Sequence, residues 1–182
     1  VDGEMSTNDS VVLISTGENK KTNFNIPSNY KKLSLELSFL CQDLAKMIIK
    51  DGEGSTKIIT INVHKSKNKS QARLVAYSLA NSNLIKTAMF GADPNWGRII
   101  ARLGSLNHID YKPEKVDLHI NKMLIFTGGI QSNKCDLKIL NKSMKKNEIV
   151  VDIFLNSGSS SHTILTSDLS HEYVHINSAY TT

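Results

Sequence analysis

The sequence KIITINVH, from Lys57 to His64, alternates apolar and polar side chains and is rich in β-branched residues. This pattern predicts a strand with one buried face. Before it, Tyr30 to Lys50 carries apolar residues three and four positions apart, which predicts an amphipathic helix that ends at Asp51-Gly52. After it, Ser70 to Ala80 predicts a second helix with its apolar residues on one side. The order helix, strand, helix favours a layered fold that contains both kinds of element.

Further predicted elements continue this alternation. We expect helices at Trp96–Leu103, Cys135–Met144 and Ser170–Tyr180, and strands at Val11–Thr16, Val116–Ile120, Met123–Phe126, Glu148–Leu155 and Ser161–Leu165. The first of these strands is continuously apolar and is expected to be buried. The second and third flank Asn121-Lys122 as a hairpin, and the last two form a strand pair across the turn NSGSS. The pattern predicts an α/β or α+β fold with a mixed sheet, in which residues 1–182 form one structural unit.

The composition narrows the class of protein. Apolar residues make up 40% and charged residues 21% of the chain, which is typical of a folded globular protein. The net charge of +5 comes almost wholly from lysines spread along the chain, so we favour solvated lysines over a nucleic-acid-binding face. No apolar run is long enough for a membrane span, and the first residues show no signal peptide. Cys41 and Cys135 are too few and too far apart for a disulfide framework, which fits a reducing compartment.

Two glycine-containing segments are candidates for a binding site. The segment DGEGSTK, Asp51 to Lys57, holds Glu53 between two glycines, where a carboxylate is well placed to meet a cationic ligand. The same segment also suits a polar turn whose glycine stops the preceding helix. The segment FGADPNWGR, Phe90 to Arg98, puts the single tryptophan, Trp96, beside a glycine. It suits either a pocket wall or a structural turn whose tryptophan anchors the next helix.

A third segment matches a metal motif. Residues His171 to His175 read HEYVH and match H-E-x-x-H, in which two histidines bind zinc and the glutamate acts as a base. Such a site needs a third ligand, yet none of the seven residues after His175 is His, Glu or Asp. We therefore favour a surface helix and expect no metal, with a zinc hydrolase as an alternative. The chain has no G-x-S-x-G elbow, and neither cysteine has an activating context, so no nucleophile is assigned within it.

Four sequence segments occur in a characteristic order. They read VDGEMSTNDS (Val1–Ser10), DGEGSTK (Asp51–Lys57), ANSNLIKTAMFGADPNWGRI (Ala80–Ile99) and DLSHEYVHINSAYTT (Asp168–Thr182). In this combination they resemble the bifunctional ornithine acetyltransferase/N-acetylglutamate synthase family of arginine biosynthesis, in its carboxy-terminal, β-chain region. The resemblance implies a mixed-sheet, layered α/β/β/α sandwich.

The family resemblance also implies an activity. In this family the precursor cuts itself into α and β chains, and the new amino-terminal threonine of the β chain is the nucleophile. The implied enzyme is an acyltransferase, a glutamate N-acetyltransferase that moves acetyl from N-acetylornithine to glutamate through a threonine acyl-enzyme. The α chain supplies the oxyanion hole, and some members also use acetyl-CoA. No cofactor is implied, and the expected assembly is a heterotetramer of two α and two β chains.

Three substrate-binding positions of the family can be located in this sequence. The glutamate of the family's GEG[AS]TK pattern is Glu53, and the terminal I-N-x-x-Y-x-T pattern supplies Asn177 and Thr182. A carboxylate such as Glu53 suits a substrate ammonium, whereas Asn177 and Thr182 suit hydrogen bonds to an amino-acid carboxylate. We assign Asp93 and Arg98 no role as ligands.

The sequence departs from the family pattern at its start. The family's nucleophile lies in an A-T-M-L type block upstream of the VDG segment, whereas this sequence begins at Val1. We therefore expect a fragment or truncated form that does not catalyse acetyl transfer alone and that leaves a sheet edge and an apolar face for the missing part. The alternative is a non-catalytic substrate-binding or assembly fragment that needs an α partner. We expect a cytoplasmic location, or the mitochondrial matrix in a eukaryote, and neither nucleic acid nor membrane as partner.

Overall fold

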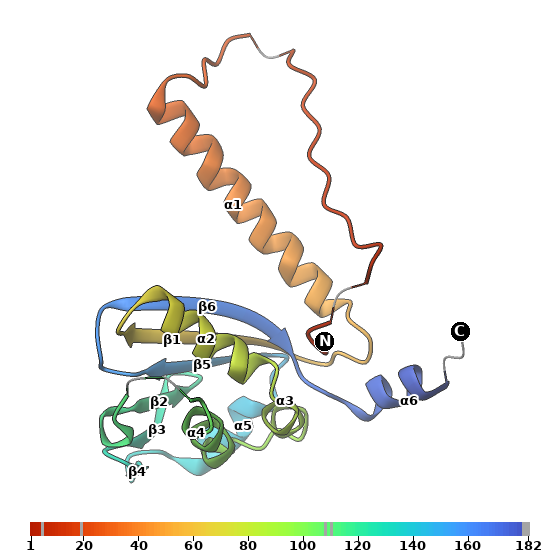
Figure 1. Cartoon of the computed structure of the whole chain (residues 1–182). Coiled ribbons are helices and arrows are strands. Elements are labelled where there is room, and N and C mark those ends of the chain that lie inside the picture. The colour runs from red at the N-terminus through yellow and green to blue at the C-terminus, as the bar shows by residue number, and fades with distance from the viewer. Residues whose placement is uncertain (5, 19, 108, 110, 180–182) are drawn as a thin grey trace.

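The computed structural model describes residues 1–4, 6–18, 20–107, 109 and 111–179. Among these residues, six strands form one mixed sheet, and α1 projects away from it (Figure 1). The helices are α1 (Pro27–Lys50), α2 (Lys69–Ala80), α3 (Asn83–Phe90), α4 (Trp96–Gly104), the short 3-10 helix η1 (Pro113–Lys115), α5 (Leu137–Met144) and α6 (His171–Ala179). The strands are β1 (Ile58–Ser66), β2 (Asp117–Ile120), β3 (Met123–Thr127), β4 (Ile130–Gln131), β5 (Glu148–Phe154) and β6 (Ser160–Ser167).

The sheet has the strand order β4-β3-β2-β5-β1-β6. Strand β1 pairs in parallel with β5 and antiparallel with β6, and the remaining pairs are antiparallel, so the predicted mixed sheet is confirmed. The predicted hairpin is also confirmed, since β2 and β3 are joined by Asn121 (φ 49°) and Lys122 (φ 69°). The predicted pairing of the last two strands is wrong, because β1 lies between β5 and β6.

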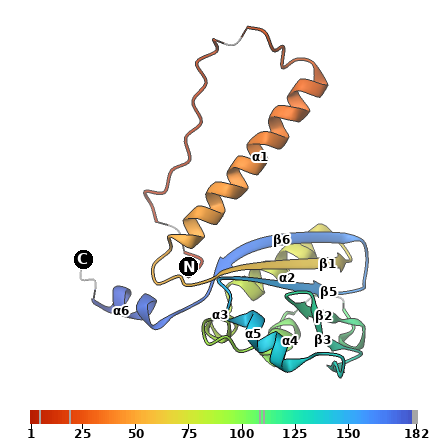
Figure 2. The ribbon, with the colours of Figure 1, turned by 180° about the vertical axis from the view of Figure 1, so that it is seen from behind.

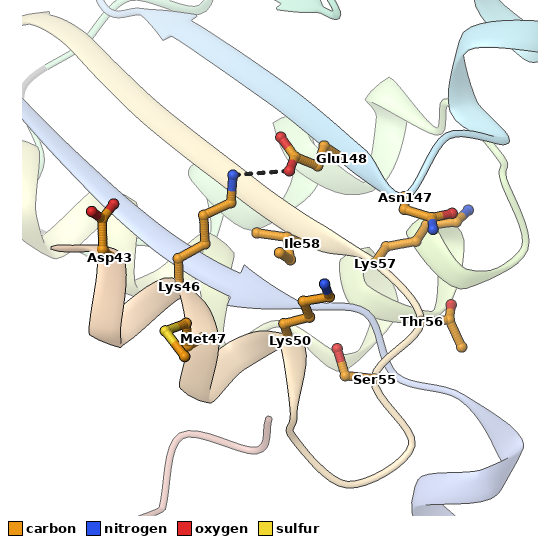
Figure 3. Close-up of a pocket in the computed structure, with 10 residues that line it drawn as sticks. All are labelled: Asp43, Lys46, Met47, Lys50, Ser55, Thr56, Lys57, Ile58, Asn147 and Glu148. Carbon is orange, nitrogen blue, oxygen red and sulfur yellow. Dashed lines mark ion pairs between the residues drawn. The ribbon is translucent and has the colours of Figure 1, made fainter.

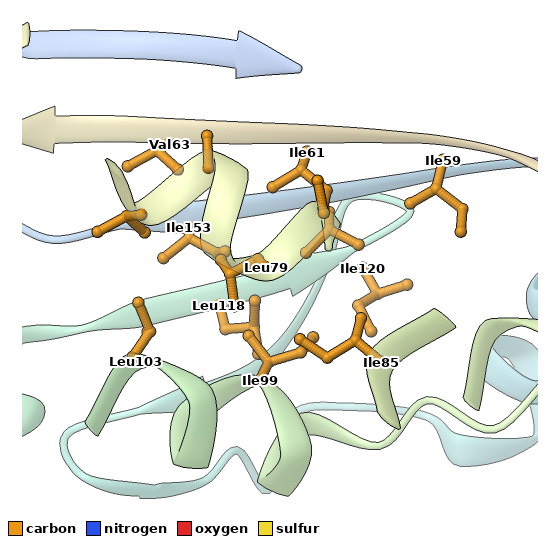
Figure 4. Packing of buried hydrophobic residues seen from close by; sticks show 14 of the residues in the cluster. Ile59, Ile61, Val63, Leu79, Ile85, Ile99, Leu103, Leu118, Ile120 and Ile153 are labelled. Atoms are coloured by element: carbon orange, nitrogen blue, oxygen red, sulfur yellow. The ribbon is translucent and has the colours of Figure 1, made fainter. Parts of the chain in front are cut away.

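The hydrophobic core lies on one face of the sheet. Alternate residues of β1, namely Ile59, Ile61 and Val63, are almost wholly buried and point toward the helices, as the period of two in their sequence predicts (Figure 4). Opposite them lie buried residues of neighbouring strands and of helices α2 to α5, among them Val75, Leu79, Ile85, Ile99, Leu103, Leu118, Ile120, Leu140 and Ile153. Helices α2 to α5 thus pack on this core, and in the view from behind the strands β6, β1 and β5 lie in front of α2 (Figure 2).

This second face carries polar side chains instead. Asn62 donates a hydrogen bond to the Asp152 carboxylate at 2.9 Å, and His64 lies 3.1 Å from the same oxygen. Thr163 donates to Asn62 at 2.8 Å, and the His64 ring stacks on Phe154 with centroids 4.6 Å apart. The alternation in KIITINVH therefore separates an apolar face under the helices from a polar face without them.

The predicted strand Val11–Thr16 is wrong. The chain there has no regular structure, and the side chains of Val11, Val12, Leu13 and Ile14 are 75 to 96% exposed. A strand needs a neighbour that bonds its backbone, and within the described part of the chain none lies beside this segment. Helix α1 has the predicted position and apolar periodicity, yet no described residue of it is buried. Both apolar segments are thus left uncovered by this chain.

The other predicted helices agree with the structure to within a few residues. Side-chain caps explain several of the starting points: Asn68 accepts from Gln71 N at the start of α2, and Asp136 caps α5 in the same way. Helix α3 lies between the second and third predicted helices, where no element was predicted. The last predicted helix is α6, although Tyr180 lies outside the described residues. No helix in the described ranges combines the length and the apolar character that crossing a membrane requires.

Candidate functional site

The predicted substrate residue Glu53 lies on the loop between α1 and β1 and is exposed. The next residue, Gly54, has φ +63°, a left-handed conformation that favours glycine. A side chain at this position would collide with the backbone nitrogen of Tyr173 in α6. The glycine therefore lets the loop lie directly against the first turn of α6.

This packing brings two predicted site residues together. The side-chain amide of Asn177 donates a hydrogen bond of 2.7 Å to the Glu53 carboxylate, although 124 residues separate them. The same amide donates to the carbonyl of Tyr173 at 3.0 Å, one turn earlier in α6. Thr182, the third predicted residue, lies outside the described residues. The substrate-binding roles of all three residues stay predictions.

The beginning of the chain also reaches this site. The Tyr173 hydroxyl donates to the Asp2 carboxylate at 2.8 Å, which raises the pKa of Tyr173 to about 12. The pKa of Asp2 is lowered, first by the hydrogen bond from the backbone N–H of Glu4 and then by that from Tyr173. These bonds favour the charged Asp2 and hold the VDGE segment beside α6. Two sequence segments singled out separately, at opposite ends of the chain, therefore meet in space.

A cavity of about 690 Å³ opens on the other side of the loop, between the last turns of α1 and the start of β1 (Figure 3). Lys50 and Ser55 extend into it, and Lys46 forms an ion pair with Glu148 at 2.8 Å across it. The carboxylates of Asp43 and Glu148 also line the cavity, and Glu148 pairs with Lys46. Lys50 and Ser55 are therefore the lining groups that suit an anionic group such as a carboxylate. The cavity is thus a candidate extension of the Glu53 site for an anionic part of a ligand.

Beneath the loop lies a buried charged cluster that the sequence interpretation missed. It consists of Lys57, Lys86 and Asp168, which are 8%, 2% and 0% exposed. The Lys57 ammonium donates to the carbonyls of Met89 at 2.5 Å and Met144 at 3.0 Å, and burial lowers its pKa. Two sequence features could have revealed the cluster. Lys86 is a lone lysine in the apolar stretch NLIKTAMF, and Asp168 stands just before the final helix.

Lys86 is the most deeply placed cation of this cluster. Its ammonium donates to the hydroxyls of Thr166 at 3.0 Å and Ser167 at 3.4 Å, near the end of β6. Burial lowers the pKa of Lys86 to about 8, and the negative charges of Asp168 and Asp2 oppose that effect. The cluster links α3, β6 and the Glu53 loop.

The FGADPNWGR segment combines both roles proposed for it. The Asn95 side chain accepts from the backbone of Arg98 and so caps α4, while Trp96 packs on Phe126 with ring centroids 5.2 Å apart. The same residues line a cavity of about 330 Å³ together with α5. Arg98 donates to the carbonyl of Leu84 at 2.7 Å, and Asp93 accepts from Asn95 at 3.0 Å. Both charged side chains therefore have partners that hold the turn.

The HEYVH segment forms the first turns of α6, which has no buried residue among those described. The His171 ring packs edge-on against Phe90 at 5.4 Å between centroids. Within the ranges that the structure covers, no three His, Cys, Asp or Glu side chains gather as a metal site would require. The helix thus has the exposed character that we expected.

Comparisons with known proteins extend these observations. The sequence is 39% identical over 184 residues to the arginine biosynthesis bifunctional protein ArgJ of Pseudomonas fluorescens, covering all of this chain and 45% of that protein. It is 40% identical over 182 residues to the protein of the same name from Neisseria meningitidis, again over 45% of its length. The chain therefore spans less than half of these curated relatives.

A solved structure matches the whole fold. The crystal structure of arginine biosynthesis bifunctional protein argJ from Bacillus halodurans superposes with a TM-score of 0.89 at 32% sequence identity. The match covers 99% of this chain and 84% of that chain, and it confirms the expected α+β fold with a mixed sheet. The profile of the ArgJ family matches residues 1–182. From the ordered motifs, the fold and these matches together, we conclude that the chain belongs to the ArgJ family.

Proposed function

We propose that this chain is the substrate-binding, β-chain portion of a glutamate N-acetyltransferase of arginine biosynthesis. The complete enzyme transfers acetyl from N-acetylornithine to glutamate through a threonine acyl-enzyme, with the threonine outside residues 1–182. The observation that carries the proposal is the 2.7 Å hydrogen bond between Asn177 and Glu53. It joins residues that two separate family motifs contribute to substrate binding.

The chemistry of this pair suits an amino-acid substrate. Glu53 is exposed and accepts from Asn177 through one carboxylate oxygen, so its other oxygen is available to a substrate ammonium. Both N–H groups of the Asn177 amide are used in this structure, on Glu53 and on the carbonyl of Tyr173, so binding of a substrate carboxylate to Asn177 and Thr182 requires Asn177 to exchange one of these bonds. The lysine-containing cavity beside the loop suits a further carboxylate, such as that of the glutamate side chain. Acetyl-CoA is the alternative acetyl donor.

The uncovered apolar segments support a partner. Val11 to Ile14 and the apolar side of α1, including Phe39, Leu40, Met47 and Ile48, are exposed. A monomeric protein rarely leaves so many large apolar side chains in water. The relatives are more than twice as long as this chain, so we assign the covering surface to the rest of the same precursor, which is the α chain and the start of the β chain. We place the assembled enzyme, two α and two β chains, in the cytoplasm, or in the mitochondrial matrix of a eukaryote.

The experiment supplies N-acetylornithine and glutamate to the full-length gene product and measures free ornithine. Release of ornithine is expected from the full-length product and not from residues 1–182 alone. Its absence from the full-length product would favour the alternative, a non-catalytic binding or assembly fragment.

The substrate role of Glu53 has its own test. Glu53→Gln in the full-length enzyme should raise the KM for N-acetylornithine about tenfold or more, because a charge-assisted hydrogen bond is lost. Glu114→Gln, which removes an exposed carboxylate of η1, is the matched control and should leave the KM within about twofold of wild type. An unchanged KM in Glu53→Gln would overturn the assigned role.

A further inference from the structure

The Glu53 loop is held from below by one buried carboxylate. Asp168, directly after β6, accepts hydrogen bonds from the backbone nitrogens of Thr56 and Lys57, each at 2.8 Å, and from the Thr56 hydroxyl. All three donors belong to the residues that follow Glu53 by three and four positions. A carboxylate with three donors fixes the backbone that it binds more firmly than a single neutral hydrogen bond does.

The other side of the loop is held by Ser170, two residues further along the chain. Its hydroxyl donates to the carbonyl of Gly54 at 2.6 Å and accepts from the backbone nitrogen of Tyr173 at 3.3 Å. The latter bond satisfies a free N–H in the first turn of α6, as a helix cap does. Ser170 therefore connects the residue after Glu53 directly to the helix that carries Asn177.

The groups around Asp168 stabilise a negative charge on its carboxylate. The side chain is fully buried, so an uncompensated charge there would be costly. The three donors and the positive charges of Lys57 and Lys86 compensate it, and Asp168 in turn favours the charged form of both lysines.

From these contacts we infer that Asp168 and Ser170 are positioning residues, which fix the loop bearing Glu53 against the helix bearing Asn177 and so set the geometry that the substrate meets. The inference rests on the proposed function, in which Glu53 and Asn177 bind substrate. Asp168 and Ser170 themselves act through Glu53 and make no contact with the substrate. The segment DLS before α6 is thus part of the site, and the HEYVH that follows it contributes Tyr173, whose carbonyl accepts from Asn177.

The first test uses Ser170→Ala in the full-length gene product, because this change removes one hydroxyl and leaves the buried charges in place. Loss of the 2.6 Å bond to Gly54 should raise the KM for N-acetylornithine about three- to tenfold and change kcat by less than about twofold. Ser170→Thr keeps a hydroxyl and should restore most of the wild-type KM. A wild-type KM in Ser170→Ala would overturn the inference.

A double-variant cycle separates a positioning role from a general loss of structure. If Ser170 acts through Glu53, the variant Glu53→Gln/Ser170→Ala should have the KM of Glu53→Gln alone, within about twofold. Fully multiplied effects would overturn the inference while leaving the proposed function intact. If Glu53→Gln alone leaves the KM unchanged, the proposed role of Glu53 fails first, and the inference fails with it.

Asp168→Asn tests the lower attachment against a matched control. Asp117 on β2 is the control because its carboxylate also accepts hydrogen bonds, from the Thr127 hydroxyl at 2.5 Å and the Asn156 amide at 3.0 Å. Asp117→Asn removes its charge. Asp168→Asn should raise the KM at least about tenfold, whereas Asp117→Asn should leave it within about twofold. Equal KM values in the two variants would refute a specific role for Asp168. If Asp168→Asn does not fold, as judged by circular dichroism, the Ser170 cycle decides the inference alone.

Discussion

Replacing the buried Lys86 by methionine should change how the stability of the chain depends on pH. Lys86 is 2% exposed, and burial lowers the pKa of its ammonium from the usual 10.5 to about 8. Between these two values the unfolded chain binds a proton that the folded chain does not. The free energy of unfolding therefore rises with pH in this window, because the proton is lost from the folded state first.

The magnitude follows from the same pair of values. The difference between 10.5 and about 8 corresponds to about 3 kcal/mol at 1.36 kcal/mol per pH unit. Titrating one such group from pH 7 to pH 9.5 should raise the free energy of unfolding by about 2 kcal/mol. Lys86→Met removes this contribution, so the stability of the variant relative to wild type should fall by about 2 kcal/mol over that interval. Groups away from this cluster titrate alike in both proteins and cancel in the comparison.

The assay is urea unfolding at pH 7 and pH 9.5, followed by circular dichroism. The control is Lys31→Met, which removes one positive charge from the exposed surface of α1. Because that side chain is solvated, the control should follow the wild-type pH dependence. Parallel changes in wild type and Lys86→Met would refute the reasoning, because they would mean that Lys86 keeps the same charge in the folded and unfolded states.

Two further predictions concern the sheet. Leu118→Ala should lower the free energy of unfolding by about 2 to 5 kcal/mol, because Leu118 is 0% exposed in a strand between β3 and β5. Leu74→Ala, at a position that is 47% exposed, is the comparison in urea unfolding, and an equal loss there would contradict the burial argument. Lys122→Gly should raise the free energy of unfolding by about 0.5 to 1 kcal/mol, because Lys122 has φ 69° in a two-residue hairpin loop. Thermal unfolding measures the change, and a lower midpoint would mean that the loop strain is smaller than the entropy that glycine adds to the unfolded chain.

The sequence predicted most helices and strands because their signals are local. Each of these signals can be read from neighbouring residues: the three-and-four spacing of α1, the alternation of β1, and the two-residue loop between β2 and β3. Val11 to Ile14 show where local signals fail. An apolar run predicts a strand only if a neighbouring strand exists, and the described residues offer none beside it. The same reason explains the wrong pairing of β5 with β6, since pairing depends on which distant strand fits between them.

The candidate site divides in the same way. The family resemblance pointed to Glu53, Asn177 and Thr182, because each stands in a short motif that can be matched without knowledge of the fold. Only the tertiary structure decided that the first two touch, and that Asp168 and Ser170 bond to the Glu53 loop across 111 to 116 residues of sequence. The burial of Lys86 likewise depends on the packing of α3 against β6. Local patterns encode secondary structure and motifs, whereas contacts, burial and shifted pKa values arise only when distant segments exclude water together.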